Sequence, residues 1–134
     1  MTTSNDSLRS IVEHFFRRID AQAWDDARDL TTPSCKVTAG GQVMDREGWI
    51  GMGQMFMTAF PDGKHDLAKV LIAGDHATIL GTFRGTHRGA FGPVAATGKT
   101  IALPFTTVYR ISEGRIAEAW LQFDSGGLMA QLSA

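Results

Sequence analysis

Apolar positions in the first half of the chain repeat at helical spacing. The repeat predicts helices over 8–19, 24–30 and 46–60. Polar residues 4–7 precede the first helix and offer side-chain oxygens that can cap it. Asp45 can cap the third helix in the same way, and the turn-forming residues 61–63 end it. The first half is therefore expected to be mainly helical, and the first helix carries a single apolar stripe.

The second half changes to the alternation of strands. The expected strands cover 65–73, 76–87, 100–111 and 115–124, with two shorter ones around Gly40-Gly41. Gly74-Asp75 and Glu113-Gly114 each supply a hairpin turn, and a Gly- and Pro-bearing loop is expected over 88–98. Residues 128–132 suggest a last helical turn. Helices followed by antiparallel strands predict an α+β fold, with helices packed in a curved, mostly antiparallel sheet around a cavity.

The last strand carries an unusual mixture of side chains on one face, because Trp120, Gln122 and Asp124 all share it. An indole, an amide and a carboxylate together suit a pocket wall, where apolar surface holds a ligand and polar groups orient it. If Glu113-Gly114 is the turn and the register is regular, strand 100–111 faces these residues. The predicted wall is then Leu103, Phe105, Thr107, Trp120, Gln122 and Asp124. Helix residues Trp49, Met52 and Phe56 are expected to complete the pocket.

Asp124 is the candidate acid/base, since partial burial makes a carboxylate useful for proton transfer near neutrality. The alternative is that Asp124 caps the backbone of the residues that follow it. Gln122 either orients a substrate carbonyl or is a solvated strand residue. His87, beside the glycine-rich loop, either takes part in catalysis or bonds to backbone. The other three histidines are assigned to surface or structure: His14, His65 and His76.

The opposite face of the last strand presents Ala117, Ala119, Leu121 and Phe123. If the helices fill the concave side of the sheet, these apolar residues lie on the convex side. An exposed apolar patch of this kind usually marks an interface. The sequence therefore predicts a homodimer through the convex face.

Composition narrows the class of protein. The chain has 134 residues, which suits one domain over 1–134, and its net charge of -1 argues against nucleic acid as a partner. No apolar stretch is long enough to span a membrane, and residues 1–6 lack the apolar core of a signal peptide. Cys35 is the single cysteine, which fits a reducing cytoplasm and a structural role. The scattered histidines form no metal motif.

Several segments together resemble the SnoaL-like polyketide cyclase family of the NTF2-like superfamily. They are Ala59-Phe60-Pro61-Asp62, Phe83-Arg84-Gly85-Thr86-His87-Arg88-Gly89, Tyr109-Arg110-Ile111, Glu113-Gly114-Arg115-Ile116, Trp120, Phe123-Asp124, Gly127-Leu128 and Gln131-Leu132. The resemblance runs from the first helix to the C-terminus. It implies a cone-shaped α+β barrel with a deep apolar cavity, usually dimeric, and chemistry without cofactor or metal.

In the family's aldol-type cyclases, an aspartate at the end of the last strand is the acid/base, and Asp124 matches that position. His87 matches a histidine common in the Gly-Thr-His segment. The cyclases also carry a histidine on the preceding strand, where this sequence has Thr107. The resemblance thus implies cyclase- or isomerase-type acid/base chemistry on an apolar carbonyl compound. A non-catalytic protein that binds a hydrophobic ligand, or a protein-interaction module, stays as an alternative.

Overall fold

The computed structural model describes residues 4–133, which form four helices and six strands. In chain order these elements are α1 (Asn5–Asp20), α2 (Trp24–Asp29), β1 (Thr31–Ala39), β2 (Gln42–Met44), α3 (Arg46–Ala59), β3 (Lys64–Ala73), β4 (His76–Thr86), β5 (Thr100–Ser112), β6 (Arg115–Phe123) and α4 (Ser125–Ser133). Each predicted helix and strand is present, with ends that move by a few residues. The α+β class predicted from the sequence is confirmed.

Helix caps lie where the polar residues predicted them. The Ser4 hydroxyl accepts a hydrogen bond from the Ser7 backbone N–H at 3.1 Å and starts α1. The Asp45 carboxylate accepts one from the Gly48 N–H at 2.8 Å and starts α3. Each cap satisfies an N–H that has no partner within the helix, so it fixes where the helix begins.

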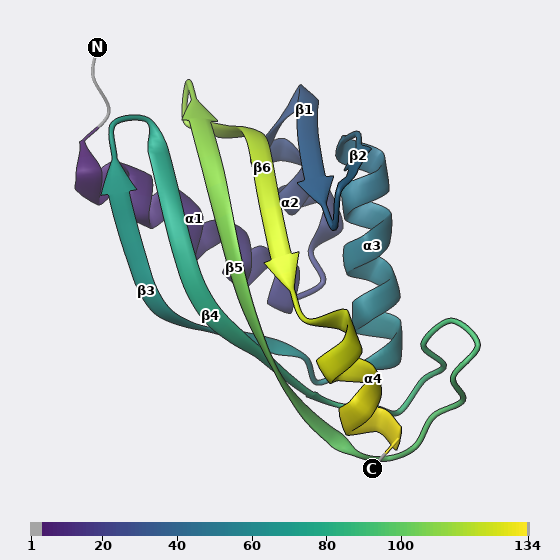
Figure 1. Ribbon diagram of the computed structural model, residues 1–134. Helices are drawn as coiled ribbons and strands as arrows, with labels where there is room; N and C mark the ends of the chain where they lie inside the picture. The colour runs from purple at the N-terminus through teal and green to yellow at the C-terminus, as the bar shows by residue number, and fades with distance from the viewer. Residues whose placement is uncertain (1–3, 134) are drawn as a thin grey trace.

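The six strands form one curved, unclosed sheet in the order β2-β1-β6-β5-β4-β3. All neighbours are antiparallel except β1 and β6, which run parallel (Figure 1). Strand β1 begins earlier than expected and contains Pro33, which has no N–H for a ladder. Its pairing with β6 shifts between Thr31 and Lys36, so Pro33 falls in the irregular stretch of the ladder.

The helices cover one face of the sheet, and the core lies between them. In Figure 1, α1 crosses behind the sheet, and α3 stands beside β1 and β2. The buried side of α1 consists of Leu8, Val12, Phe15 and Phe16. These side chains meet the inward-facing residues of β4 and β5, including Ile79 and Tyr109. The apolar stripe of α1 therefore determines which sheet face becomes the concave one.

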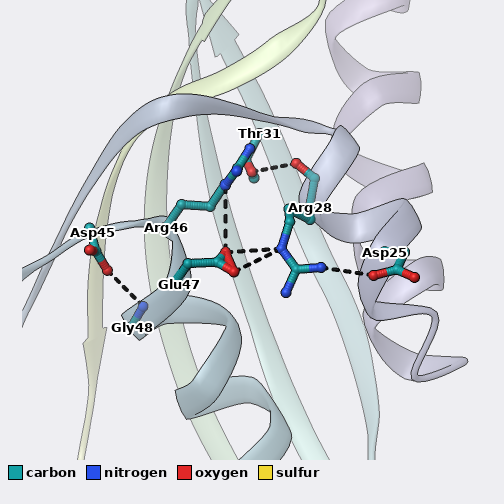
Figure 2. Close-up of polar contacts among 7 residues, drawn as sticks. All are labelled: Asp25, Arg28, Thr31, Asp45, Arg46, Glu47 and Gly48. Atoms are coloured by element: carbon teal, nitrogen blue, oxygen red, sulfur yellow. Dashed lines mark hydrogen bonds and ion pairs between the residues drawn. The ribbon is translucent and has the colours of Figure 1, made fainter.

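A salt-bridge cluster joins α2 to the start of α3 (Figure 2). The Arg28 Nε donates to both carboxylate oxygens of Glu47 at 2.9 Å, and its Nη1 donates to Asp25 at 2.8 Å. The hydrogen bond from Arg28 lowers the pKa of the Glu47 carboxyl. Thr31, the first residue of β1, donates from its hydroxyl to the Arg28 carbonyl at 2.7 Å. This cluster ties α2, β1 and α3 together at one end of the fold.

The β5–β6 hairpin has the predicted turn but not the predicted register. Glu113 and Gly114 both have positive φ, 53° and 78°, which is the geometry of a tight hairpin turn. Ile111 pairs with Ile116 as expected, yet Arg110 pairs with Glu118, so Ala117 is an extra residue on β6. Such a bulge shifts every later pair by one position and reverses the faces. Thr107 therefore pairs with Leu121 and Phe105 with Phe123.

The bulge overturns two predictions about the faces of β6. Trp120 and Gln122 lie opposite Val108 and Thr106, so they do not share a face with Phe105 and Thr107. Conversely, the predicted convex row turns inward: Ala119 is fully buried, and Leu121 and Phe123 line the cavity described below. The interface predicted from Ala117, Ala119, Leu121 and Phe123 is therefore wrong in its residues.

Candidate functional site

A cavity of about 100 Å³ lies between α1, α3 and the concave face of the sheet. It is lined by Phe15, Phe16, Ile19, Met52, Gly53, Phe56, Met57, His65, Phe83, Leu103, Phe105, Thr107, Tyr109, Leu121 and Phe123. An engineered apolar cavity of about 150 Å³ can hold a benzene molecule. The space seen here suits one small ring, and a larger ligand would require its wall to move.

Aromatic side chains form most of the cavity wall. The Phe16 ring packs against Phe105 and Tyr109, with ring centroids 5.8 and 6.0 Å apart. At the other end, the Phe56 ring makes edge contacts with Phe83 at 5.9 Å and Phe123 at 5.7 Å. Such a wall attracts apolar ligands and excludes water, so polar groups that face it act in a poorly screened environment.

Two of the residues that line the cavity from β5, Thr107 and Tyr109, carry hydroxyl groups. The Thr107 hydroxyl donates to the Trp120 carbonyl at 2.9 Å, which fixes its rotamer across the β5–β6 ladder. Tyr109 is buried, and burial raises the pKa of its phenol well above its ordinary value. Tyr109 therefore stays protonated and keeps a hydrogen to donate.

His65 is the only histidine among the described residues that line the cavity, and histidine is the usual side chain for general acid/base catalysis. Its Nδ1 lies 2.6 Å from an Asp20 carboxylate oxygen, and its backbone N–H donates to the other oxygen at 3.0 Å. Both side chains are more than four-fifths buried, with 18% and 17% exposed. No hydrogen bond joins the His65 Nε2 to residues 4–133, and the ring packs 5.0 Å from that of Phe16.

Asp20 thus fixes the imidazole of His65 in the same way that a carboxylate fixes the histidine of a catalytic dyad. A carboxylate on Nδ1 selects the tautomer that has its proton there and leaves the Nε2 lone pair free to accept another. The pair joins the last residue of α1 to the start of β3, 45 positions later. Neither residue belongs to the site predicted from the sequence, which assigned His65 to surface or structure.

One sequence signal could have indicated Asp20. It lies four residues after Phe16, so it falls on the apolar stripe of the first helix. A carboxylate on the buried side of a helix needs a partner, and a histidine is a natural one. The identity of that partner depends on how β3 packs beside α1, which no local pattern in the sequence specifies.

The structure brings together five of the predicted pocket residues: Met52, Phe56, Leu103, Phe105 and Thr107. Trp49 lies behind the wall, where its ring stacks on Phe15 at 5.1 Å and meets Tyr109 edge-on at 5.7 Å. Trp49 therefore supports the cavity without lining it.

The predicted polar residues of β6 lie outside this cavity. Gln122 is exposed, and the Trp120 ring stacks on His76 at 6.1 Å on the opposite side of the sheet. Asp124 is also exposed, and its carboxylate accepts a hydrogen bond from the Gly127 N–H at 2.8 Å at the start of α4. This geometry matches the capping alternative for Asp124. The physical reason is the bulge at Ala117, which turned this face of β6 outward.

His87 is fully buried at the base of the loop that follows β4, and it does not line the cavity. The Thr97 backbone N–H donates to its Nδ1 at 3.2 Å, and the Thr97 hydroxyl lies 3.0 Å from the same atom. Its ring packs 5.4 Å from Phe60. The Nε2 has no hydrogen-bond partner among residues 4–133. These contacts match the alternative in which His87 holds the loop through backbone.

Within residues 4–133, no cluster of three or more His, Cys, Asp or Glu side chains could hold a metal ion. Cys35 is buried, and burial raises the pKa of its thiol to about 11. A thiol in this environment stays protonated and is a poor nucleophile. Among the same described residues, no helix combines the length and apolar character needed to cross a bilayer.

Comparison with known proteins identifies the relatives of this chain. The profile of the SnoaL-like polyketide cyclase family matches residues 10–132. IdmH of Streptomyces antibioticus, a proposed polyketide cyclase, is 25% identical over 95% of this chain and 99% of its own, with a TM-score of 0.86. A proposed SnoaL-like polyketide cyclase from Jannaschia sp. CCS1 is 20% identical over 100% and 98%, with a TM-score of 0.87.

A third similar structure is AclR of Streptomyces galilaeus, a proposed hydroxylase. It is 16% identical over 97% of this chain and 98% of its own, with a TM-score of 0.90, so it supports the fold alone. The sequence matches none of the curated proteins. A curved sheet that encloses an apolar cavity beneath its helices is the architecture of the NTF2-like superfamily. Within that superfamily, the chain belongs to the SnoaL-like polyketide cyclase family.

Proposed function

We propose that this protein is an enzyme that moves a proton next to a carbonyl group of a small cyclic substrate held in the cavity. Family membership supports a cyclase or isomerase kind of function on a small molecule. The observation that carries the finer proposal is the His65–Asp20 pair, because it places a base at the edge of a wall that is otherwise almost wholly apolar.

The proposed reaction needs only side chains of the cavity. The His65 Nε2 accepts a proton from the carbon beside the carbonyl, and the electron pair of the broken C–H bond forms an enolate. The Tyr109 hydroxyl donates a hydrogen bond to the enolate oxygen. The imidazolium then returns its proton to another carbon, which isomerises the substrate. In a cyclisation, the enolate carbon instead attacks a second carbonyl, and the imidazolium protonates the new alkoxide.

The cavity limits the part of the substrate that reacts. A volume of about 100 Å³ admits one small ring, not a fused polycycle. Met52 and Met57 line the cavity, and unbranched thioether side chains adapt readily to a new shape. A larger substrate would therefore enter by displacing these two side chains.

The experiment uses cyclohex-3-enone, a single-ring ketone whose conversion to the conjugated cyclohex-2-enone raises ultraviolet absorbance. The wild type is expected to accelerate this reaction over buffer. His65→Gln is expected to lower kcat/KM by about a hundredfold or more, while binding of the single-ring probe butylbenzene to the cavity is retained. His14→Gln is the matched control, because His14 is exposed on α1. Equal rates for the wild type and His65→Gln would refute the proposal.

We also propose that two copies associate through the convex face. One row of paired residues crosses all six strands on this face: Val43, Thr38, Trp120, Val108, Thr78 and Leu71. Val43 and Leu71 are 61% and 55% exposed at its two ends. Four of the six residues in this row are apolar, and an exposed apolar patch favours an interface. A cytoplasmic location stays a prediction from the single cysteine.

A further inference from the structure

A second hollow adjoins the cavity on the outside of the fold. It is a groove of about 350 Å³ between α1 and β3, which is an edge strand of the sheet. Its floor includes Leu67, Ala68 and Val70 from β3. The pairing of β3 with β4 shifts between Leu67 and Lys69, so Ala68 is an extra residue there. A bulge of this kind bends an edge strand and redirects its side chains.

The groove and the cavity share two residues, Phe16 and His65. The two rings lie 5.0 Å apart between centroids and form the common boundary of the two spaces. A ligand that extended from the cavity into the groove would therefore pass beside the imidazole of His65. The proposed base lies at the junction of the two spaces, and Asp20 reaches it from the groove side.

The groove has a rim of unpaired positive charge. Arg9 and Arg17 line it from α1, where they lie about two turns apart on one side of the helix. Both are exposed, and neither forms an ion pair with a residue of 4–133. Asp20 is already bound to His65, which leaves Glu13 as the remaining carboxylate of the groove. Two free guanidinium groups thus outnumber one carboxylate beside an apolar floor.

We propose that this groove binds the anionic end of an elongated amphiphile whose ring occupies the cavity. The ligand class is a cyclic compound that carries a carboxylate, sulfonate or phosphate at the end of a short spacer. Guanidinium groups suit such anions because their N–H groups form paired hydrogen bonds with two oxygens. The inference rests on the proposed function in one respect, since it assumes that the reacting ring lies in the cavity.

The experiment compares two single-ring probes by ligand-observed NMR. 4-Phenylbutane-1-sulfonate carries a sulfonate at the end of a short spacer, and butylbenzene does not. The wild type is expected to bind the sulfonate more tightly, and only that binding is expected to weaken with added NaCl. Arg9→Gln and Arg17→Gln should each weaken it about threefold, and the double variant about tenfold, as for exposed ion pairs. Binding of the uncharged probe should not change.

Arg115→Gln is the matched control, because Arg115 is exposed at the β5–β6 turn, remote in sequence from both α1 and β3. It should leave the binding of both probes as in the wild type. The inference would be overturned if the Arg9→Gln and Arg17→Gln variants bound both probes more weakly to the same extent, or if they bound the sulfonate as tightly as the wild type. Isomerisation of cyclohex-3-enone by the wild type is measured in parallel. If it persists while the sulfonate preference is absent, the anionic subsite fails and the proposed function stands.

Discussion

Asp20→Asn tests whether the buried carboxylate holds His65 in the state that leaves its Nε2 free. In the wild type, Asp20 accepts two hydrogen bonds from His65, at 2.6 Å from Nδ1 and 3.0 Å from the backbone N–H. An asparagine oxygen can keep the backbone bond, but its NH₂ group then faces Nδ1. Donation from that NH₂ selects the opposite tautomer, with the proton on Nε2.

The expected loss of stability follows from these contacts. One charge-assisted hydrogen bond between groups that are 17% and 18% exposed becomes a neutral one. Such bonds contribute about 1.5–3 kcal/mol when charged and about 1 kcal/mol when neutral. We therefore expect Asp20→Asn to lower the free energy of unfolding by about 1–2 kcal/mol in urea. Asp26→Asn is the control, because its 3.8 Å pair with Arg18 is exposed and should contribute less than about 1 kcal/mol.

The tautomer itself is measured without knowledge of the substrate. Long-range proton–nitrogen correlation spectra of labelled protein, in mildly alkaline buffer, distinguish a protonated Nδ1 from a protonated Nε2. The wild type should show the proton on Nδ1 of His65, and Asp20→Asn should move it to Nε2 and lower turnover with it. A wild type that already has the proton on Nε2 would refute the proposed role of Asp20, whatever the change in stability.

Three further predictions concern the exposed Asp62–Thr86 hydrogen bonds, the cavity wall and the convex face. Hydrogen bonds from the backbone and hydroxyl of Thr86 lower the pKa of Asp62. The contribution of these hydrogen bonds to folding stability is therefore complete above the ordinary pKa of the carboxyl group. It is lost as the pH falls through the lowered pKa of Asp62 in the folded protein. Asp62→Ala should lower the free energy of unfolding by roughly 1 kcal/mol at neutral pH, because Asp62 is exposed, and should not change it in strong acid. Urea unfolding at the two pH values measures both effects, and an equal loss of stability at both would contradict this prediction. Gly81→Ala would bring its Cβ within 2.5 Å of the Asp66 carbonyl oxygen and 2.7 Å of the Phe105 ring. It should therefore destabilise the fold by about 1–3 kcal/mol and shrink or distort the cavity. Full stability with unchanged binding of butylbenzene would argue against this packing. Trp120→Glu should convert a dimer to a monomer in light scattering without unfolding it, and a wild type that is monomeric at high concentration would exclude the convex interface.

Much of the fold could be predicted because the signals were local. The stripe on the first helix, the cap at Asp45 and the turn at Glu113-Gly114 each depend on residues close together in the sequence. The glycine and glutamate of that turn both adopt positive φ, as a two-residue hairpin turn requires. Such features are encoded within a few residues, so they do not depend on the remainder of the fold.

The candidate site was predicted only in part, and the reason is one extra residue. Phe105 and Thr107 were placed correctly on the cavity wall because β5 alternates regularly. Ala117 broke the alternation in β6, and the partners predicted for Phe105 and Thr107 were wrong by one position. Ala119, Leu121 and Phe123 form the more apolar face of that strand, and this pattern would have favoured the register that the structure has.

By itself, the sequence determined the helices, the strands, the turns and four of the apolar residues that line the cavity, because hydrophobic periodicity and capping act over short distances. Only the tertiary structure decided which polar groups meet that cavity. The side of β6 that faces inward depended on a bulge, and the contact between His65 and Asp20 depended on α1 packing beside β3. A bulge reverses a whole strand face, and a contact across 45 positions exists only after the chain has folded.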